Sequence, residues 1–360
     1  MTDLSDPLDL ARGPQWRNRL MLAPLTNVQS HPDGTLSDAE TAWLLARARG
    51  GFGLVMTAAA YVTPAGKAWA GQLGIDADDR LPGLERLATG LRGAGAVSAV
   101  QLHHGGKRAD SDVSGVPLVS AYVDEAKGAR ALTTGEVAAV VEDFAGAAAR
   151  AERAGFDGVE IHGAHGYLLC QFLDPVRNLR DDGYGGDYAG RVRIIHEVVA
   201  AIREATGPDV QVGLRLSPER HGVVLEDMVR LAGEVMATGS LDYLDLSIWD
   251  VRKRPHEADP ADPRLLIDHF TPLPRGGTRL AVAGAVTGAA EAQWCLDRGA
   301  DIAVVGKGAI VDHAFAQHAV SDPTYAAPAF PVPRDHLRAE QLSEPFVEYF
   351  ATGWPHLVRD

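Results

Sequence analysis

His162, His165 and Tyr167 lie within six residues of one another, directly after the apolar run at residues 158–161. Two imidazoles can donate hydrogen bonds to a carbonyl or nitro oxygen, and a phenol can deliver a proton. The glycines between them leave space for a flat ligand. A single histidine is more often a satisfied core or loop residue. Two at the mouth of a buried strand, together with a tyrosine, predict a site of substrate chemistry.

Arg215 is a second candidate, because it stands inside the otherwise apolar run at residues 210–216. An unpaired cation in a protein interior is very costly, so Arg215 needs an anionic partner or several acceptors. One interpretation is an ion pair with a carboxylate such as Glu160. The other is contact with the negatively charged edge of a reduced flavin.

Glycine turns follow two further apolar runs. Gly284 follows one run, and Gly306 and Lys307 follow the other. The backbone N–H groups of such turns bind phosphate, and a lysine supplies the counter-charge. Tight turns alone would also explain the glycines. Together with Lys307 they favour a phosphate site.

Eight short apolar runs position these groups. They lack the alternation of half-exposed strands and are typical of parallel strands that are covered on both faces. The predicted strands are residues 20–23, 53–58, 97–102, 158–162, 210–216, 241–246, 280–283 and 302–305.

Amphipathic helices are predicted between these strands. Residues 37–40 have the pattern of a capping box that opens a helix running to Ala48. Residues 136–154 and 191–205 each carry one apolar face. Further helices are predicted at residues 226–237, 264–270 and 288–298.

Eight strand–helix units indicate a closed (βα)8 TIM barrel. We expect one domain over residues 1–360, with an irregular lead at about 1–18 and a C-terminal tail at about 321–360. A doubly wound open sheet is the alternative, but no Gly-x-Gly-x-x-Gly turn follows the first strand. Three long loops, at residues 103–132, 163–187 and 247–263, follow strands and would gather at the catalytic face.

The composition narrows the classes of partner. The 360-residue chain is 46% hydrophobic and has a formal net charge of -14, which argues against nucleic-acid and anionic membrane partners. We find neither an apolar leader nor an apolar run of membrane-spanning length. The two cysteines, Cys170 and Cys295, cannot form a disulfide framework. These features favour a folded protein of the reducing cytoplasm.

The densest motif surrounds the histidine pair. Residues 157–169 read DGVEIHGAHGYLL, residues 171–175 read QFLDP, and residues 178–186 read NLRDDGYGG. Together with residues 18–19, 23–24, 101 and 103–107, they resemble the old yellow enzyme family of FMN-dependent ene-reductases, also called NADH:flavin oxidoreductases. The resemblance covers roughly residues 17–310.

The resemblance implies a non-covalent FMN over the barrel mouth. Hydride from NADH or NADPH would pass through the flavin to the C=C bond of an electron-poor alkene in a ping-pong cycle. His162 and His165 would bind the activating carbonyl or nitro oxygen of the substrate, and Tyr167 would donate the proton. The implied FMN contacts are Pro24, Leu25, Thr26 and Ala59 beside O4 and N5, Gln101 at the pyrimidine edge, Arg215 at N1 and O2, and Gly284, Gly306 and Lys307 at the phosphate.

The sequence departs from the family pattern in places. Thr26 stands where one branch has a redox-tuning cysteine, so the chain is similar to the threonine-bearing branch. Lys307 replaces the commoner arginine, which removes a bidentate phosphate contact. Residues 346–354 loosely resemble a tail that reaches the neighbouring active site in some dimeric relatives, but the expected arginine is missing. The cysteine-rich iron–sulfur segment of larger relatives does not occur in this sequence.

Other interpretations stay open at this point. A flavin-dependent dehydrogenase or demethylase could use the same scaffold. A zinc hydrolase could use His162 and His165, with His103 or His104 as the third ligand, although the spacing is not His-Glu-x-x-His. A non-enzymatic binding role would not explain the polar residues at the ends of the predicted strands. The sequence does not indicate which alkene is the substrate or whether NADH or NADPH is preferred. It also does not indicate whether the protein is a monomer or a homodimer.

Overall fold

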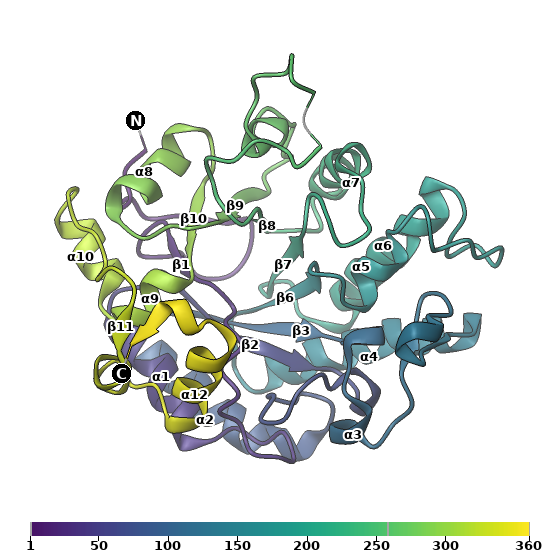
Figure 1. Cartoon of the computed structure of the whole chain (residues 1–360), viewed down its shortest axis with the longest axis horizontal. Helices are drawn as coiled ribbons and strands as arrows, with labels where there is room; N and C mark the ends of the chain where they lie inside the picture. The colour runs from purple at the N-terminus through teal and green to yellow at the C-terminus, as the bar shows by residue number, and fades with distance from the viewer. Residues whose placement is uncertain (1, 258, 360) are drawn as a thin grey trace.

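Eight parallel strands close into a barrel at the centre of the molecule (Figure 1). The computed structural model describes residues 2–257 and 259–359. Neighbouring strands follow in the order β1, β2, β3, β6, β7, β8, β9 and β10, and β10 pairs with β1. Their bounds are β1 Leu20–Leu22, β2 Leu54–Tyr61, β3 Val97–His103, β6 Gly158–Gly163, β7 Gln211–Leu216, β8 Tyr243–Ser247, β9 Arg279–Ala283 and β10 Ile302–Val305.

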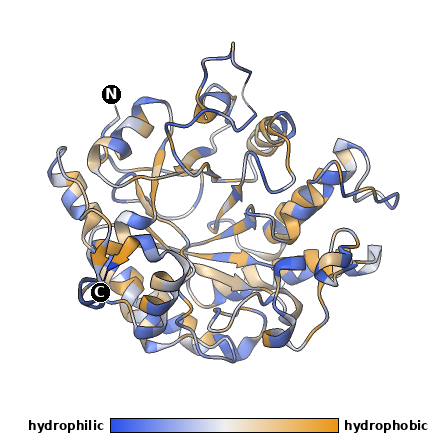
Figure 2. Ribbon diagram, viewed as in Figure 1, coloured by the Kyte–Doolittle hydropathy of each residue, from blue (hydrophilic) through white to orange (hydrophobic). Residues whose placement is uncertain are grey.

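Helices surround the barrel, and both helices and strands carry many hydrophobic residues, which are orange in Figure 2. Buried residues of the helices and of the strands form one hydrophobic core. In α4, for example, Val137, Val140 and Phe144 are buried, as their spacing predicts. The longer helices are α1 Asp38–Arg49, α2 Leu81–Gly93, α4 Thr134–Arg153, α6 Tyr188–Ala205, α7 Leu225–Ala237, α8 Ala289–Asp297 and α10 Phe315–Ser321. Shorter ones are α3 Ser111–Ser114, α5 Leu168–Phe172 and α9 Lys307–Val311.

The predicted fold class is confirmed, because every predicted strand overlaps one strand of the barrel. The helix predicted at residues 264–270 is present only as a short 3-10 helix, Leu266–His269. Pro272 and Pro274 follow it closely, and a proline disfavours helical backbone in the residue before it. An α-helix therefore has no room to continue.

The capping box predicted at the start of α1 forms only in part. Ser37 accepts a hydrogen bond from the Glu40 backbone N–H at 3.1 Å, but the Glu40 carboxylate binds Asn27 and Ser30 instead of returning to the cap. A complete capping box begins α4. There the Thr133 hydroxyl accepts from the Glu136 N–H at 3.2 Å, and the Glu136 carboxylate accepts from the Thr133 N–H at 2.8 Å.

The N-terminal lead closes the barrel at the end where the strands begin. Trp16 is fully buried, its ring centroid lies 5.8 Å from that of Tyr243, and its indole N–H donates to Gln211 at 3.0 Å. The Tyr243 ring crosses the backbone of Gly213, where a Cβ would lie only 2.1 Å from the ring. Filling this end leaves the opposite end, where the strands finish, as the place for a ligand.

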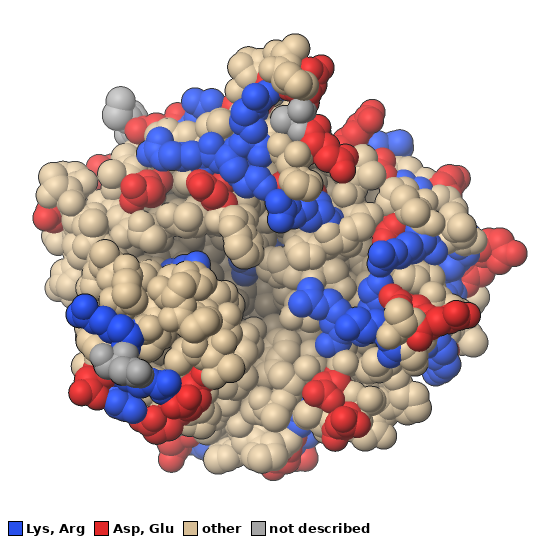
Figure 3. All heavy atoms as spheres, viewed as in Figure 1, with Lys and Arg blue, Asp and Glu red and all other residues tan. Residues whose placement is uncertain are grey.

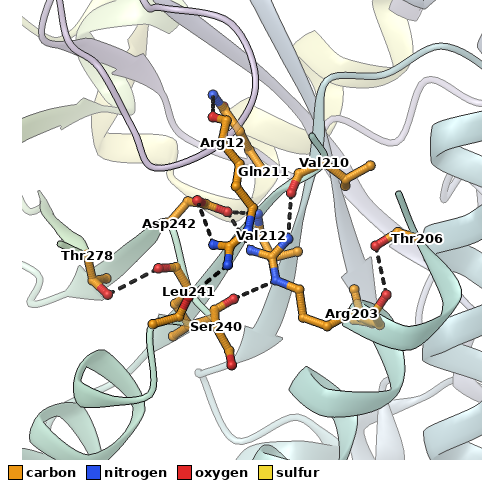
Figure 4. A network of polar contacts seen from close by, with 12 residues as sticks. Arg12, Arg203, Thr206, Val210, Gln211, Val212, Ser240, Leu241, Asp242 and Thr278 are labelled. Carbon is orange, nitrogen blue, oxygen red and sulfur yellow. Dashed lines mark hydrogen bonds and ion pairs between the residues drawn. The ribbon is translucent and has the colours of Figure 1, made fainter. Parts of the chain in front are cut away.

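Asp242 connects the lead to two strands and a helix at this closed end (Figure 4). Its carboxylate is fully buried and accepts from Arg12 at 3.2 Å, from Arg203 at 2.5 Å and from the Val212 N–H at 2.8 Å. Two cations and one amide thus depend on a single carboxylate.

The C-terminal segment lies against α1 and beside the barrel mouth (Figure 1). The Phe346 ring packs against Trp43 with the centroids 5.7 Å apart. The segment contains β11 Val332–Pro333, α11 Arg334–Ala339, α12 Glu344–Gly353 and β12 Val358–Arg359, and β11 pairs with β12. A second small pair, β4 Val119–Ser120 and β5 Arg130–Ala131, lies in the long loop after β3.

We expect Asp242→Asn to lower the free energy of unfolding by about 3 kcal/mol, because it removes a fully buried carboxylate and leaves half-buried Arg203 without its counter-ion. Urea unfolding followed by circular dichroism measures the loss. Asp262→Asn is the matched control, since it removes a carboxylate whose partner Arg264 is exposed. Equal effects of the two substitutions would contradict the importance of the Asp242 network.

Candidate active site

His162 is the penultimate residue of β6, and His165 lies in the turn that follows this strand. The backbone of His165 is left-handed, with φ of 59°, and this turn brings the His165 Nδ1 to 3.3 Å from the His162 Nε2. The two ring centroids are 5.0 Å apart and the rings are nearly perpendicular. The paired imidazoles expected from the sequence are therefore side by side at the barrel mouth.

Two serines from neighbouring strand ends hold His165. The Ser217 hydroxyl accepts from the His165 backbone N–H at 2.9 Å, and the Ser247 Oγ lies 2.8 Å from the His165 Nε2. The guanidinium of Arg215 donates to the same Ser247 oxygen at 3.4 Å. Position and tautomer of His165 thus depend on residues of β7 and β8.

Tyr167 faces the histidine pair. Its ring centroid is 5.1 Å from His162 and 4.3 Å from His103, which ends β3. The guanidinium of Arg108 lies over the outer face of the Tyr167 ring, 4.7 Å from its centroid. Trp69 contacts His103 with the centroids 5.5 Å apart. The mouth is therefore lined by flat rings on one side.

Gln72 sets the orientation of His103. The Gln72 amide nitrogen lies 3.1 Å from the His103 Nδ1 and donates to the Ala59 carbonyl at 2.9 Å. Because an amide NH2 can only donate, the His103 Nδ1 accepts and the ring proton is on Nε2. The His103 Nε2 is buried and has no partner among the described residues. It is a free donor within the ring cluster.

Burial keeps the mouth histidines neutral. It lowers the pKa of His162 and of His165 well below the usual 6.5, and the positive charge of Arg215 lowers both further. The pKa of His103 falls to about 3 by the same desolvation. Burial also raises the pKa of Tyr167, which keeps the phenol protonated. The site therefore offers neutral N–H and O–H donors.

Arg215 is neutralised inside the barrel. Its Nε lies 3.2 Å from the Asp245 carboxylate in β8, whereas Glu160 accepts from the Gln101 amide at 2.7 Å. The predicted alternative of an ion pair with Glu160 is thus replaced by one with Asp245. Burial raises the pKa of Glu160 and of Asp245.

The other predicted cofactor residues meet at the same end of the barrel, because all of them follow or end parallel strands. Ala59 lies opposite Gln101 in the register of β2 and β3. The Leu25 side chain approaches Gly306, since a Cβ there would be 3.6 Å from the Leu25 Cδ2. The remaining positions are Pro24 and Thr26 after β1, Gly284 after β9, and Lys307 after β10.

Several residues at the mouth were not predicted as part of the site. Ser247 and Ser217 support His165, Gln72 orients His103, and Arg108 covers Tyr167. The two serines could have been recognised from the sequence, because each is a polar residue directly after a predicted strand. Gln72 and Arg108 lie in long loops, where the sequence gives no comparable signal.

The tail lies close to the site. Residues 346–354 resemble a segment that reaches a neighbouring active site in some dimeric relatives, and such an interface stays a prediction. Here α12 lies beside its own barrel, and the Tyr349 hydroxyl faces Thr26 of the same chain. Burial raises the pKa of Tyr349. The tail therefore borders the site of the chain that carries it.

The histidines do not form a metal-ligand group. Among the residues that the structure describes, three ligand atoms converge within 4.8 Å only at Asp312, His313 and Glu340, and no such group includes His162 and His165. The predicted zinc alternative lacks its third ligand in this arrangement.

Comparison with known proteins identifies the family. The model of the NADH:flavin oxidoreductase / NADH oxidase family matches residues 3–321. The chain belongs to this family. The resemblance to old yellow enzymes is thereby confirmed, and the chain is an NAD(P)H-dependent FMN oxidoreductase. Enzymes of this type reduce C=C bonds.

Individual relatives agree along most of the chain. It is 37% identical over 321 residues to the probable NADH-dependent flavin oxidoreductase YqiG of Bacillus subtilis, covering 86% of this chain and 85% of the relative. It is 33% identical over 309 residues to an NADPH dehydrogenase of Listeria welshimeri, covering 84% and 90%. The structure of morphinone reductase in complex with tetrahydroNAD is similar, with a TM-score of 0.78 and 25% identity over 100% of this chain and 98% of that one.

The residues at the mouth fit FMN. A Cβ at Gly306 would meet only side-chain atoms at 3.6 and 3.9 Å, so space is open above this turn. Lys307 is exposed and has no carboxylate partner in the described part of the chain. Buried Arg215 and Gln101 supply a cation and an amide on the opposite side of the mouth.

None of the described helices has the length and apolar character for crossing a membrane.

We expect the rings of His103 and His162 to stay neutral between about pH 5.5 and 8, because burial lowers the pKa of His103 to about 3 and that of His162 well below the usual value. Ring-proton NMR shifts of both residues should be flat across it, with assignments from His103→Gln and His162→Gln. A titration with a midpoint near the usual histidine pKa would contradict the burial argument.

Proposed function

We propose that the enzyme transfers a hydride from NAD(P)H, through FMN, to the C=C bond of an electron-poor alkene that carries a carbonyl or nitro group. FMN, when bound, supplies the capacity to accept a hydride from one substrate and to pass it to the other. NAD(P)H and the alkene use the same mouth in turn, which makes the cycle ping-pong. A homodimer is compatible with these roles, but it is not required, since every proposed site residue belongs to one chain.

The histidine pair carries this proposal. The His162 Nδ1 accepts from the Ala164 N–H at 3.2 Å, so the proton of the neutral ring is on Nε2, facing His165. Without substrate, the His162 Nε2–H faces the His165 Nδ1 at 3.3 Å, and that Nδ1 accepts. The Ser247 hydroxyl can accept from the His165 Nε2 or donate to it, so it permits either tautomer of His165. With the His165 proton on Nδ1, a substrate oxygen placed between the rings would accept from both.

Such a pair assists the reaction because both N–H groups would donate to the same substrate oxygen. Two hydrogen bonds to a carbonyl or nitro oxygen withdraw electrons from the conjugated alkene and stabilise the negative charge that develops on that oxygen. Because His162 and His165 are neutral, they donate hydrogen bonds to the substrate oxygen and do not protonate it. Tyr167 faces them with a protonated phenol and is assigned the donation of a proton to the substrate carbon.

The cofactor contacts follow from the same arrangement. We assign Pro24, Leu25, Thr26 and Ala59 to the flavin side that reacts, Gln101 and Arg215 to the pyrimidine edge, and Gly284, Gly306 and Lys307 to the phosphate. Arg215 is well suited to its place, since Asp245 balances its charge without covering the guanidinium completely. Lys307 offers a single ammonium to the phosphate.

A dehydrogenase or demethylase on this scaffold would need a group that removes a proton from the substrate. The mouth holds neutral imidazoles and a protonated phenol, and the nearest carboxylates, Glu160 and Asp245, are buried within the barrel. This donor-rich surface favours reduction of an activated alkene over oxidation of an amine.

Anaerobic rapid mixing of the FMN-loaded enzyme tests the proposal. NADPH or NADH should reduce the enzyme, and cyclohexenone should reoxidise it after the nicotinamide product is removed. We expect Tyr167→Phe to slow only the second step, by roughly tenfold to a thousandfold, because solvent replaces a general acid incompletely. Tyr188→Phe is the control, since its hydroxyl binds Glu234 on the outer helices. If cyclohexenone reoxidises no reduced enzyme, the proposed reaction is wrong. An unchanged rate in Tyr167→Phe would assign the proton to another donor.

Phenols test the histidine pair at equilibrium. A phenolate oxygen should accept from both rings while the aromatic ring stacks on the flavin, which gives a long-wavelength absorption band. We expect His162→Ala and His165→Ala each to raise the phenol dissociation constant, and the double variant to lose less than the sum. His196→Ala, in α6, is the control. Wild-type phenol affinity and enone reduction in both single variants would make the histidines structural.

A further inference from the structure

Arg108 is a cation at the mouth that lacks a carboxylate partner. Its guanidinium lies over the Tyr167 ring and donates to the His165 carbonyl oxygen. No carboxylate in the described part of the chain forms an ion pair with it. It therefore lies next to two proposed reaction residues with its charge uncompensated.

Two other basic residues that line this region have carboxylate partners. Lys107 binds Asp124 at 2.8 Å, and Arg177 lies 3.9 Å from Asp174. The Asp174 side chain is buried and accepts from the N–H groups of Val176 and Arg177, each at 2.9 Å. The Asp174 carboxylate, which lines the same pocket as Arg108, is thus already occupied.

A surface pocket of about 460 Å³ opens beside this arginine. Arg108, Gly166, His221 and Arg177 are among its lining residues. Gly166 lies between His165 and Tyr167, and a Cβ there would be 3.8 Å from the Arg108 guanidinium and 3.6 Å from His221. Arg108 and His221 therefore flank the backbone that carries the histidine pair and the tyrosine.

The local charge contrasts with that of the whole protein. The chain has a net charge of -14, yet Lys and Arg side chains gather around the central hollow in Figure 3. Partial desolvation, followed by the charges of Arg108 and Arg220, lowers the pKa of His221, so that its ring is neutral near pH 7 and can donate an N–H. A bound anion would offset the uncompensated charge of Arg108.

We propose that Arg108, with His221 beside it, binds an anionic oxygen group, a carboxylate or a phosphate, of a molecule whose reacting part lies against His162 and His165. A guanidinium can bind such a group with two parallel N–H donors, which gives both attraction and orientation. The group belongs either to an alkene substrate that bears a carboxylate or to the phosphates of NAD(P)H. The inference rests on the proposed function for the position of the reacting part.

Paired substrates distinguish the two sources. Ring-substituted cyclohexenones bearing a carboxymethyl group are compared with their methyl esters, and the acid-to-ester ratio of kcat/KM is measured. If the alkene carries the anion, Arg108→Gln should lower this ratio at least about tenfold, Arg108→Lys should lower it less, and Arg108→Glu should favour the ester. If the dinucleotide carries it, Arg108→Gln should raise the Kd for NADPH or NADH in the reduction step.

Arg86→Gln is the matched control, because Arg86 lies in α2 and is exposed with only a backbone partner. The ratio is insensitive to a general loss of activity, so a disturbance of Tyr167 or His165 does not imitate the effect. An unchanged acid-to-ester ratio together with an unchanged dinucleotide Kd in Arg108→Gln and Arg108→Glu overturns the inference.

Failure of the proposed function would be recognised separately. If the wild type reduces neither acid nor ester, the Kd values of hydroxybenzoates and of their methyl esters are measured by the absorbance change of the FMN-loaded enzyme. Weaker binding of the acids alone in Arg108→Gln supports the anion site even then. Equal loss or no loss for acids and esters overturns it.

Discussion

The buried positive charge of Arg215 constrains both the barrel and its mouth. A cation within a barrel requires a carboxylate, and Asp245 on the neighbouring strand supplies it at 3.2 Å. Glu160 is buried close by, and two carboxyl groups around one cation cannot both be ionised without excess negative charge, in keeping with their raised pKa values. The guanidinium in turn reaches Ser247, and Ser247 reaches His165. The ion pair in the barrel core is therefore connected, through one hydroxyl group, to the position of His165.

Much of this arrangement could be predicted from local sequence. The barrel strands are short apolar runs without alternation, and this pattern can be recognised without knowing which strands pair with one another. The histidine pair and Tyr167 were found because they lie within one loop, so their proximity needed no knowledge of the fold. Gly306 and Lys307 were found for the same reason. The roles of these residues toward FMN and substrate remain proposals.

What could not be predicted depends on strand register and long loops. Glu160 and Asp245 are both acidic residues in strands, and only the pairing of Arg215 with Asp245 across β7 and β8 distinguishes them. The Glu40 side chain left its expected cap because Asn27 and Ser30, from another loop, offered buried donors. The position of α12 beside the barrel mouth of the same chain likewise depends on tertiary packing. The sequence of residues 346–354 does not indicate which barrel mouth the helix lies against.

The closure of the barrel between β1 and β10 has a consequence for how the protein is made. Leu20 pairs with Ala303, so the first strand finds one of its neighbours only after residue 303 has left the ribosome. Contacts of such long range form slowly, and until then the three-residue β1 has an open edge. The proposed FMN contacts after β1 and β10 come together only at that step. A nascent chain would thus become able to hold its cofactor at the moment its barrel closes, which would make flavin uptake a marker of completed folding.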